Sequence, residues 1–153
     1  MKVRRQSAGL LAFRRKHGSL EVFLVHMGGP FWQRKEAGAW SIPKGEFEDE
    51  APLTAAMREF REETGLVPEG TFLALSPIRQ SGGKTVHAFA VEWDCDPASI
   101  KSNTFRLEWP KSSGVMREFP EVDRAEWFTV GEARAKLVKG QVALIDELDT
   151  RLS

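Results

Sequence analysis

Three glutamates, Glu59, Glu62 and Glu63, are spaced so that a helix brings their carboxylates onto one face, turned largely away from its apolar residues. The helix is predicted to begin at Pro52, because apolar residues recur from there at i, i+3, i+4 and i+7. These residues are Leu53, Ala56, Met57 and Phe60. Gly65 ends the pattern and is typical of a helix C-terminus.

The glutamate face carries a repulsion that a hard divalent cation relieves. Like charges at this spacing cost a few tenths of a kcal/mol per pair, and Arg58, one turn before Glu62, lies in helical reach to offset them. Mg²⁺ takes oxygen ligands and often bridges carboxylates to substrate phosphates. Two interpretations are open on spacing alone: a solvated helix face rich in glutamate, or a metal-dependent site for phosphate chemistry.

The composition favours one domain that acts on a small substrate. With 153 residues, of which 41% are hydrophobic, the chain is long enough for a single core over residues 1–153. Its 22 basic and 22 acidic residues cancel, so charge gives no reason to expect long nucleic acid or a membrane as partner. The single cysteine, Cys95, leaves no intrachain disulfide and no zinc-ligand spacing, and a cytoplasmic location is the default expectation. The apolar run at 8–13 is too short for a membrane span.

Short apolar runs alternate with turns along the chain, which predicts a mixed sheet covered by helices, an α/β fold. Strands are expected at 6–14, 20–26, 71–79, 86–93, 104–109 and 124–129, hairpin turns at 16–19 and 80–84, a short turn or 3₁₀ piece at 94–103, a turn at 110–114, and C-terminal helices at 130–137 and 142–152. His26 and His87 lie in strand-like runs and are interpreted as structural, whereas His17 is interpreted as a turn residue.

The segment 27–39 is rich in glycine and contains Pro30, which predicts a loop. Two interpretations are open for its aromatic residues Phe31 and Trp32. They cover the core, or they offer a stacking surface for a nucleobase. Under the second interpretation Trp32 is the candidate substrate-binding residue.

The string R-E-F-x-E-E-x-G-L from Arg58 to Leu66, with Glu50 eight residues before Arg58 and Gly45 upstream, resembles the signature of the Nudix hydrolases, G-x5-E-x7-R-E-U-x-E-E-x-G-U. The segment W-S-I-P-K-G at 40–45 is similar to the strand and turn that lead into that signature. The resemblance covers about residues 6–148. In one departure, four residues (E-F-E-D) separate Gly45 from Glu50 where the family pattern has five.

The resemblance implies an α/β/α sandwich with a mixed sheet, and hydrolysis of a diphosphate linkage in a nucleoside diphosphate joined to another group. It implies Mg²⁺ or Mn²⁺ held by the three glutamates of the helix, with a contribution from the Gly45 carbonyl. Arg58 is then expected to orient a carboxylate, for which Glu50 is the candidate. One carboxylate deprotonates the attacking water, and Glu62 is among the candidates.

Within that family, two positions look most like dinucleoside polyphosphate hydrolases. Those enzymes have a lysine near the substrate phosphates at a place similar to Lys84, and a functional glutamate at a spacing before a tryptophan similar to that of Glu121 before Trp127. Glu118 is the rival to Glu121, and exposed loop carboxylates are the alternative for both. Lys44 of the W-S-I-P-K-G segment is also expected to bind substrate. The alternative functions are nucleoside triphosphate clean-up and a non-catalytic nucleotide-binding module, which the shortened loop favours.

Overall fold

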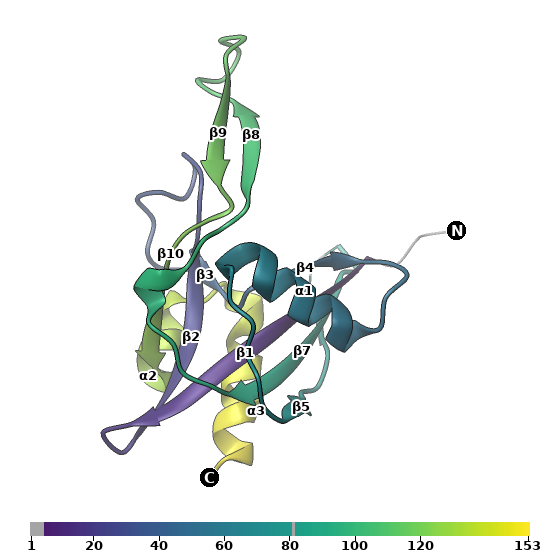
Figure 1. Cartoon of the computed structure of the whole chain (residues 1–153), viewed down its shortest axis with the longest axis vertical. Helices are drawn as coiled ribbons and strands as arrows, with labels where there is room; N and C mark the ends of the chain where they lie inside the picture. Colours follow the sequence, from purple (N-terminus) through teal and green to yellow (C-terminus); the bar gives the residue numbers. More distant parts are fainter. Residues whose placement is uncertain (1–4, 81) are drawn as a thin grey trace.

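The computed structural model describes residues 5–80 and 82–153 and contains a mixed sheet with helices on both faces (Figure 1). Along the sheet the strand order is β10 (Val122–Thr129), β2 (Ser19–Met27), β1 (Gln6–Lys16), β7 (Thr85–Glu92) and β5 (Phe72–Ala74). Three short strands extend it: β3 (Trp40–Ser41) pairs with β2, β4 (Lys44–Phe47) with β1, and β6 (Ile78–Arg79) with β7. The pairing of β1 with β7 is parallel, and the others are antiparallel.

Helix α1 (Pro52–Thr64) covers one face of the sheet, and α2 (Val130–Lys136) and α3 (Val142–Arg151) cover the other. Side chains alternate along a strand, so Leu10 of β1 packs in the core with α1 while Leu11 packs in the core with α2 and α3. Short 3₁₀ turns lie at η1 (Pro97–Ser99) and η2 (Lys139–Gln141). The predicted α/β/α sandwich is therefore confirmed.

Helix α1 begins and ends where the sequence predicts. Pro52 occupies the first turn, where its missing N–H costs nothing, and Gly65 adopts φ +74° and donates its N–H to the Arg61 carbonyl at 2.7 Å. Of the two interpretations open for the glutamate face, a solvated surface does not fit, because Glu59 and Glu63 are each only 9% exposed. Strand β4 lies over them, so these carboxyls face protein.

Strand β1 brings β4 and β7 close to each other, since its first residues pair with both. Ala8 is in register with Gly45 on one side and with His87 on the other. At Gly9 an added Cβ would come within 2.7 Å of the Lys44 Cβ and 2.6 Å of the Pro43 carbonyl oxygen. Only glycine permits this close approach, which fixes where Lys44 leaves the strand.

A two-stranded ribbon, β8 (Thr104–Glu108) and β9 (Met116–Pro120), projects from the sheet beside the loop at 28–39 (Figure 1). The sequence predicted β8 as 104–109 but not β9, because neither face of the run M-R-E-F-P is buried in a core. The predicted strand at 71–79 is also wrong as one element. It divides into β5 and β6, with Pro77 in the intervening segment.

Three smaller predictions can be compared with the structure. The hairpin at 80–84 is closed by a hydrogen bond from the Gln80 N–H to the Lys84 carbonyl at 2.8 Å, while Ser81 lies outside the described residues. His17 has φ +53° in the predicted turn after β1. Within the described part of the chain, no helix has the length and apolar character needed to cross a membrane.

Candidate active site

Four carboxyl groups gather where α1, β4 and the start of β10 meet. Glu59 and Glu63 are buried under β4, Glu62 is half-exposed on the same helix, and Glu121 approaches from the residue before β10. The structure thus brings together the three glutamates that the helix spacing predicted and the loop carboxylate that only the family resemblance suggested.

Arg58 ties this acidic cluster to the loop before α1. Its Nε and Nη2 donate to Glu50, with Nη2 to Oε1 at 2.6 Å, and its Nη1 donates to Glu59 Oε1 at 3.0 Å and Glu62 Oε1 at 3.2 Å. The short loop from Gly45 therefore still delivers Glu50 to Arg58. The predicted contact between these two side chains is confirmed. Arg58 thus donates hydrogen bonds to three carboxylates.

The acidic cluster holds more negative charge than Arg58 neutralises. Burial raises the pKa of Glu63 to about 8, with Glu59 and Glu121 adding repulsion. Burial and the charge of Glu62 raise the pKa of Glu59, and loss of surrounding water together with Glu62 raises the pKa of Glu121. Without a cation, each of these shifts favours the protonated form of the carboxyl. A bound cation would instead stabilise the ionised form.

The donor set fits a hard divalent cation. Carboxylate and carbonyl oxygens are the ligands Mg²⁺ prefers, and a Cβ atom at Gly45 would overlap the carboxyl group of Glu59. Glycine thus keeps open the space where that carboxyl meets β4. Within residues 5–80 and 82–153, no three His, Cys, Asp or Glu side chains already converge as ligands of one ion. Arg58 Nη1 donates hydrogen bonds to both Glu59 and Glu62, so the positions of these two carboxylates are set by the guanidinium.

Two lysines flank the acidic cluster. Lys44, the first residue of β4, is near enough to Lys84 for their side chains to interact, and burial followed by the charge of Lys84 lowers the pKa of Lys44. Glu63 and Glu46 are close enough to raise that pKa in part. Two adjacent ammonium groups beside buried carboxyls suit a ligand that carries several negative charges together with a cation, such as a metal-bound diphosphate.

The structure separates Glu121 from its rival Glu118. Glu118 lies on β9, where its Oε1 accepts a hydrogen bond from the Thr104 hydroxyl at 2.6 Å. Glu121 interacts electrostatically with Glu59, Glu62 and Glu63. Its backbone is fixed on both sides, since its N–H donates to the Asn103 carbonyl and its carbonyl accepts from the Gly28 N–H.

Trp32 covers part of the core, in agreement with the first of its two interpretations, and its role in substrate binding stays a prediction. It is half-buried and packs against the core on the α2 and α3 side, with Lys35 Nζ 5.1 Å from its ring centre. Its neighbour Phe31 is 58% exposed and lies edge-to-face against Trp109, with ring centres 5.2 Å apart. The sequence could not predict that Phe31 is the more exposed of the two, because neighbouring residues in a loop carry no periodic signal of burial.

Both strand histidines are hydrogen-bonded, as the sequence predicted. His26 is fully buried, with Nδ1 2.8 Å from Asp123 Oδ1 and Nε2 2.6 Å from the Lys35 carbonyl oxygen. His87 Nε2 lies 2.8 Å from Gln6 Oε1. Neither side chain is directed to the acidic cluster by these contacts.

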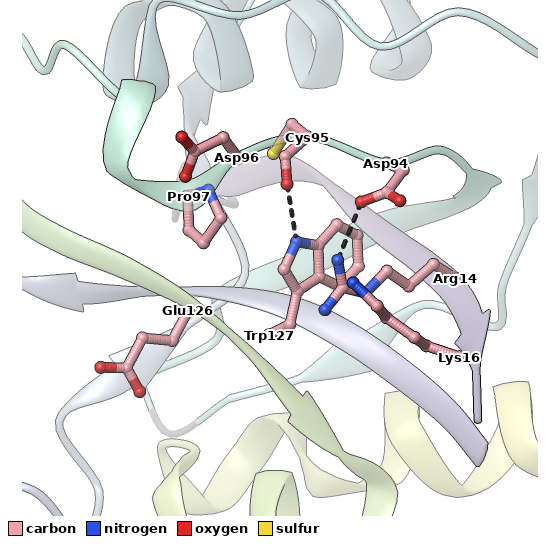
Figure 2. Close-up of a pocket in the computed structure, with 8 residues that line it drawn as sticks. All are labelled: Arg14, Lys16, Asp94, Cys95, Asp96, Pro97, Glu126 and Trp127. Atoms are coloured by element: carbon pink, nitrogen blue, oxygen red, sulfur yellow. Dashed lines mark hydrogen bonds and ion pairs between the residues drawn. The ribbon is translucent and has the colours of Figure 1, made fainter.

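A pocket of about 810 Å³ lies at the other end of β10, around Trp127 (Figure 2). Its polar groups bond mainly to each other: Arg14 lies 4.4 Å from the Trp127 ring centre and donates to Asp94, and the Trp127 N–H donates to the Cys95 carbonyl. Burial raises the pKa of the Cys95 thiol to about 11, so this cysteine is not an activated nucleophile. Trp127 follows Glu121 by six positions of extended chain, about 20 Å, so this pocket is distinct from the acidic cluster.

Comparisons with known proteins agree with the geometry. A family model described as "NUDIX domain" matches residues 3–148. Among solved structures, a Caenorhabditis elegans Ap4A hydrolase in a binary complex has a TM-score of 0.69 at 19% identity, covering 97% of each chain. The NUDIX domain of Shewanella oneidensis NrtR, solved with ADP ribose, has a TM-score of 0.70 at 16% identity, covering 100% of this chain and 91% of that one. At these identities the likeness shows the fold.

A sequence relative covers a shorter segment. The chain is 48% identical over 50 residues to the RNA pyrophosphohydrolase of Xanthomonas campestris, which is 31% of this chain. The matched segment spans only about a quarter of that protein's length, 24%.

Proposed function

The chain belongs to the Nudix family, and we propose that it is a divalent-cation-dependent hydrolase of a diphosphate linkage in a nucleoside diphosphate joined to another group. The observation that carries this proposal is the set of four carboxyls beside two lysines, Lys44 and Lys84, at one end of α1. Anionic oxygens hold the cation and ammonium groups hold phosphate, so both halves of a metal-bound diphosphate have partners.

Each residue has a distinct task in this proposal. Glu59, Glu62 and Glu63, with the Gly45 carbonyl, would hold Mg²⁺ or Mn²⁺, and such an ion would supply charge neutralisation at the phosphates and a water of lowered pKa. Arg58 fixes the positions of Glu59 and Glu62 through its hydrogen bonds to both. Glu50 holds Arg58 in turn, through the paired contacts to Nε and Nη2. Neither Arg58 nor Glu50 needs to touch the substrate.

Glu121 is the proposed general base. Its raised pKa makes it a better proton acceptor than an ordinary carboxylate, and its position opposite α1 faces the helix glutamates. It takes a proton from the attacking water as the water oxygen bonds to phosphorus and the bridging P–O bond of the diphosphate breaks, so that the other phosphate leaves with the bridging oxygen. Lys44 and Lys84 hold the phosphate oxygens on the other side, so that substrate charge is balanced during the attack.

Among substrates, a dinucleoside polyphosphate is the first candidate. Supporting it are the fold likeness to an Ap4A hydrolase and the placement of Lys84 beside Lys44. A triphosphorylated RNA end is the second, on the strength of the 48% identity over 50 residues to an RNA pyrophosphohydrolase. Nucleoside triphosphates are the third candidate. Dinucleoside polyphosphates and nucleoside triphosphates are both small nucleotide-type ligands. The shortened loop no longer favours a non-catalytic module, because it still brings Glu50 to Arg58 at 2.6 Å.

The experiment that tests the proposal is a phosphate-release screen with Mg²⁺ present. The panel contains dinucleoside polyphosphates, nucleoside triphosphates, nucleotide sugars, dinucleotide cofactors and a 5′-triphosphorylated oligonucleotide. Turnover of at least one diphosphate is expected, and it should be lost with EDTA. Binding of several panel members without turnover of any would indicate the nucleotide-binding module instead.

A further inference from the structure

The β8–β9 ribbon begins at the acidic cluster. Glu121 directly follows β9, and its carbonyl accepts a hydrogen bond from the Gly28 N–H at 2.9 Å. At Asn103, just before β8, the backbone N–H donates to the Glu62 carbonyl at the end of α1. The base of the ribbon is thereby attached to the helix and the loop that form the candidate active site, as Figure 1 shows.

Aromatic side chains continue outward from this base. Phe105 and Phe119 lie with ring centres 6.0 Å apart, and the Phe105 ring fills the space above Gly29, where an added Cβ would be 2.9 Å from it. Four residues farther along the same strand direction, about 13 Å, Trp109 meets Phe31 edge-to-face. The inner pair, Phe105 and Phe119, packs the ribbon against the loop at Gly29. The outer pair, Trp109 and Phe31, lies farther from the base of the ribbon.

The outer end of the ribbon and the loop beside it carry several strongly exposed apolar side chains. Phe31 is 58% exposed, Met116 50% and Val115 49%, and these are three of the four large apolar side chains that are strongly exposed among the described residues. The fourth, Val67, lies beyond α1. A group of exposed apolar side chains at the outer end of a ribbon whose base joins a candidate active site is typical of a ligand-binding surface.

The charges of the ribbon suit a phosphorylated ligand. Within the described residues Arg106, Lys111 and Arg117 form no ion pair with a carboxylate. The ribbon's carboxylates instead accept hydrogen bonds from neutral groups of the ribbon itself. Glu108 accepts from the Ser112 N–H, and Glu118 accepts from the Thr104 hydroxyl. The ribbon therefore offers cations and aromatic faces together.

We propose that Phe31, supported by Trp109, binds the second nucleobase of a dinucleoside polyphosphate, the base separated from the reacting linkage by the remaining phosphates. The proposal rests on the proposed function and adds the residues that select a substrate with two bases. Phe31 is strongly exposed and Trp109 packs edge-to-face against its ring. Arg117, two residues before Phe119 and therefore on the same face of the ribbon, would supply a cation for the intervening phosphates. Trp32, half-buried against the core, anchors the same loop.

The test compares equilibrium binding of two non-hydrolysable methylene-bridged probes, a dinucleoside tetraphosphate and the same tetraphosphate with one nucleoside. Base–aromatic stacking predicts that Phe31→Ala raises the Kd of the two-base probe roughly five- to a hundred-fold. The Kd of the one-base probe should change less than about twofold. Phe31→Trp should restore two-base binding, whereas Val67→Ala, an exposed apolar residue beyond α1, should bind both probes like wild type.

Several results would overturn the proposal. Unchanged two-base binding by Phe31→Ala, equal weakening of both probes, or absence of two-base binding by wild type would each do so. A Phe31→Ala effect confined to a 5′-triphosphorylated dinucleotide would also overturn it and assign the surface to an RNA end. The proposed function fails separately: wild type that binds the two-base probe through Phe31 but hydrolyses no diphosphate would contradict the hydrolase and leave this surface assigned.

Discussion

The carboxyl group of Glu59 lies directly against the backbone of Gly45, in the space that a Cβ atom at that glycine would fill. A methyl group there must displace the carboxyl from β4, although nothing in the core changes. We therefore expect Gly45→Ala to weaken Mn²⁺ binding roughly ten- to a hundred-fold, the range seen when a ligand's orientation is lost.

Isothermal titration with Mn²⁺ and a thermal melt together check this expectation. Gly131→Ala is the matched control, because an added Cβ at Gly131 meets no atom within 4 Å. An alanine at position 45 that binds Mn²⁺ as tightly as wild type would show that Glu59 is not held by β4 for metal binding.

Removing Arg58 should lower both stability and rate. Its guanidinium bonds to Glu50, Glu59 and Glu62, so Arg58→Ala leaves three carboxylates repelling one another without their shared cation. The side chain is 36% exposed, so solvent screening limits the loss of melting temperature to a few degrees. Arg61→Ala, an exposed position on the same helix, is the control for helix propensity and should leave both quantities unchanged.

The stability of the metal-free protein should fall as pH rises. Glu63 has a folded-state pKa of about 8 against an ordinary value of 4.5, so the folded state binds its proton more tightly than the unfolded state. Stability from this group is complete below pH 4.5 and is lost between 4.5 and about 8. Denaturant melts of EDTA-treated protein at several pH values measure the free energy of unfolding as a function of pH. Glu63→Gln should flatten the slope of that free energy against pH. A wild-type slope equal to that of the variant would refute the assignment.

Gln141 connects the helical layer to the strand that precedes the acidic cluster. Its fully buried side chain accepts a hydrogen bond from the Ile42 N–H at 3.0 Å and donates to the Ser41 hydroxyl at 2.9 Å. Gln141→Leu leaves both groups without these partners, which predicts a loss of about 1–3 kcal/mol in the free energy of unfolding. Urea denaturation checks it, with Gln33→Leu, at an exposed position of the loop before β3, as control. A loss below about 0.5 kcal/mol would mean that water replaces the amide.

The parts of the fold with local periodicity could be predicted from the sequence, and those set by distant pairing could not. Helix α1, with Pro52 at its start and Gly65 at its end, follows from residues within one segment. Strand β9 has no buried face, so its conformation comes from pairing with β8. The approach of Lys44 to Lys84 arises because β1 pairs with β4 on one side and β7 on the other.

The site shows the same division. Helical spacing predicted that Glu59, Glu62 and Glu63 share a face, but their burial depends on β4, which no helical pattern contains. The choice between Glu118 and Glu121 needed the ribbon. Glu118 lies on β9 and bonds to Thr104, whereas Glu121 follows β9 and interacts with the helix glutamates. Their functional roles stay predictions.

Glu121 should be far more important for turnover than Glu118. A positioned general base contributes about 10²–10⁴-fold, so Glu121→Gln should lower kcat by that order with little change in melting temperature. Glu118→Gln should retain the wild-type rate, because its contact is to Thr104 on the ribbon. If Glu118→Gln were impaired and Glu121→Gln were not, the assignment of the base would be reversed.

The most direct test of metal-dependent hydrolysis at this acidic cluster is kcat of wild type and of Glu62→Gln on the best substrate of the screen, each with Mg²⁺ and with EDTA. Glu62 is half-exposed, so the substitution leaves no core cavity and the melting temperature should hold. We predict that EDTA abolishes wild-type turnover and that Glu62→Gln lowers kcat by about 10²-fold or more in Mg²⁺. Undiminished turnover in EDTA, or a wild-type rate for Glu62→Gln, would contradict the account.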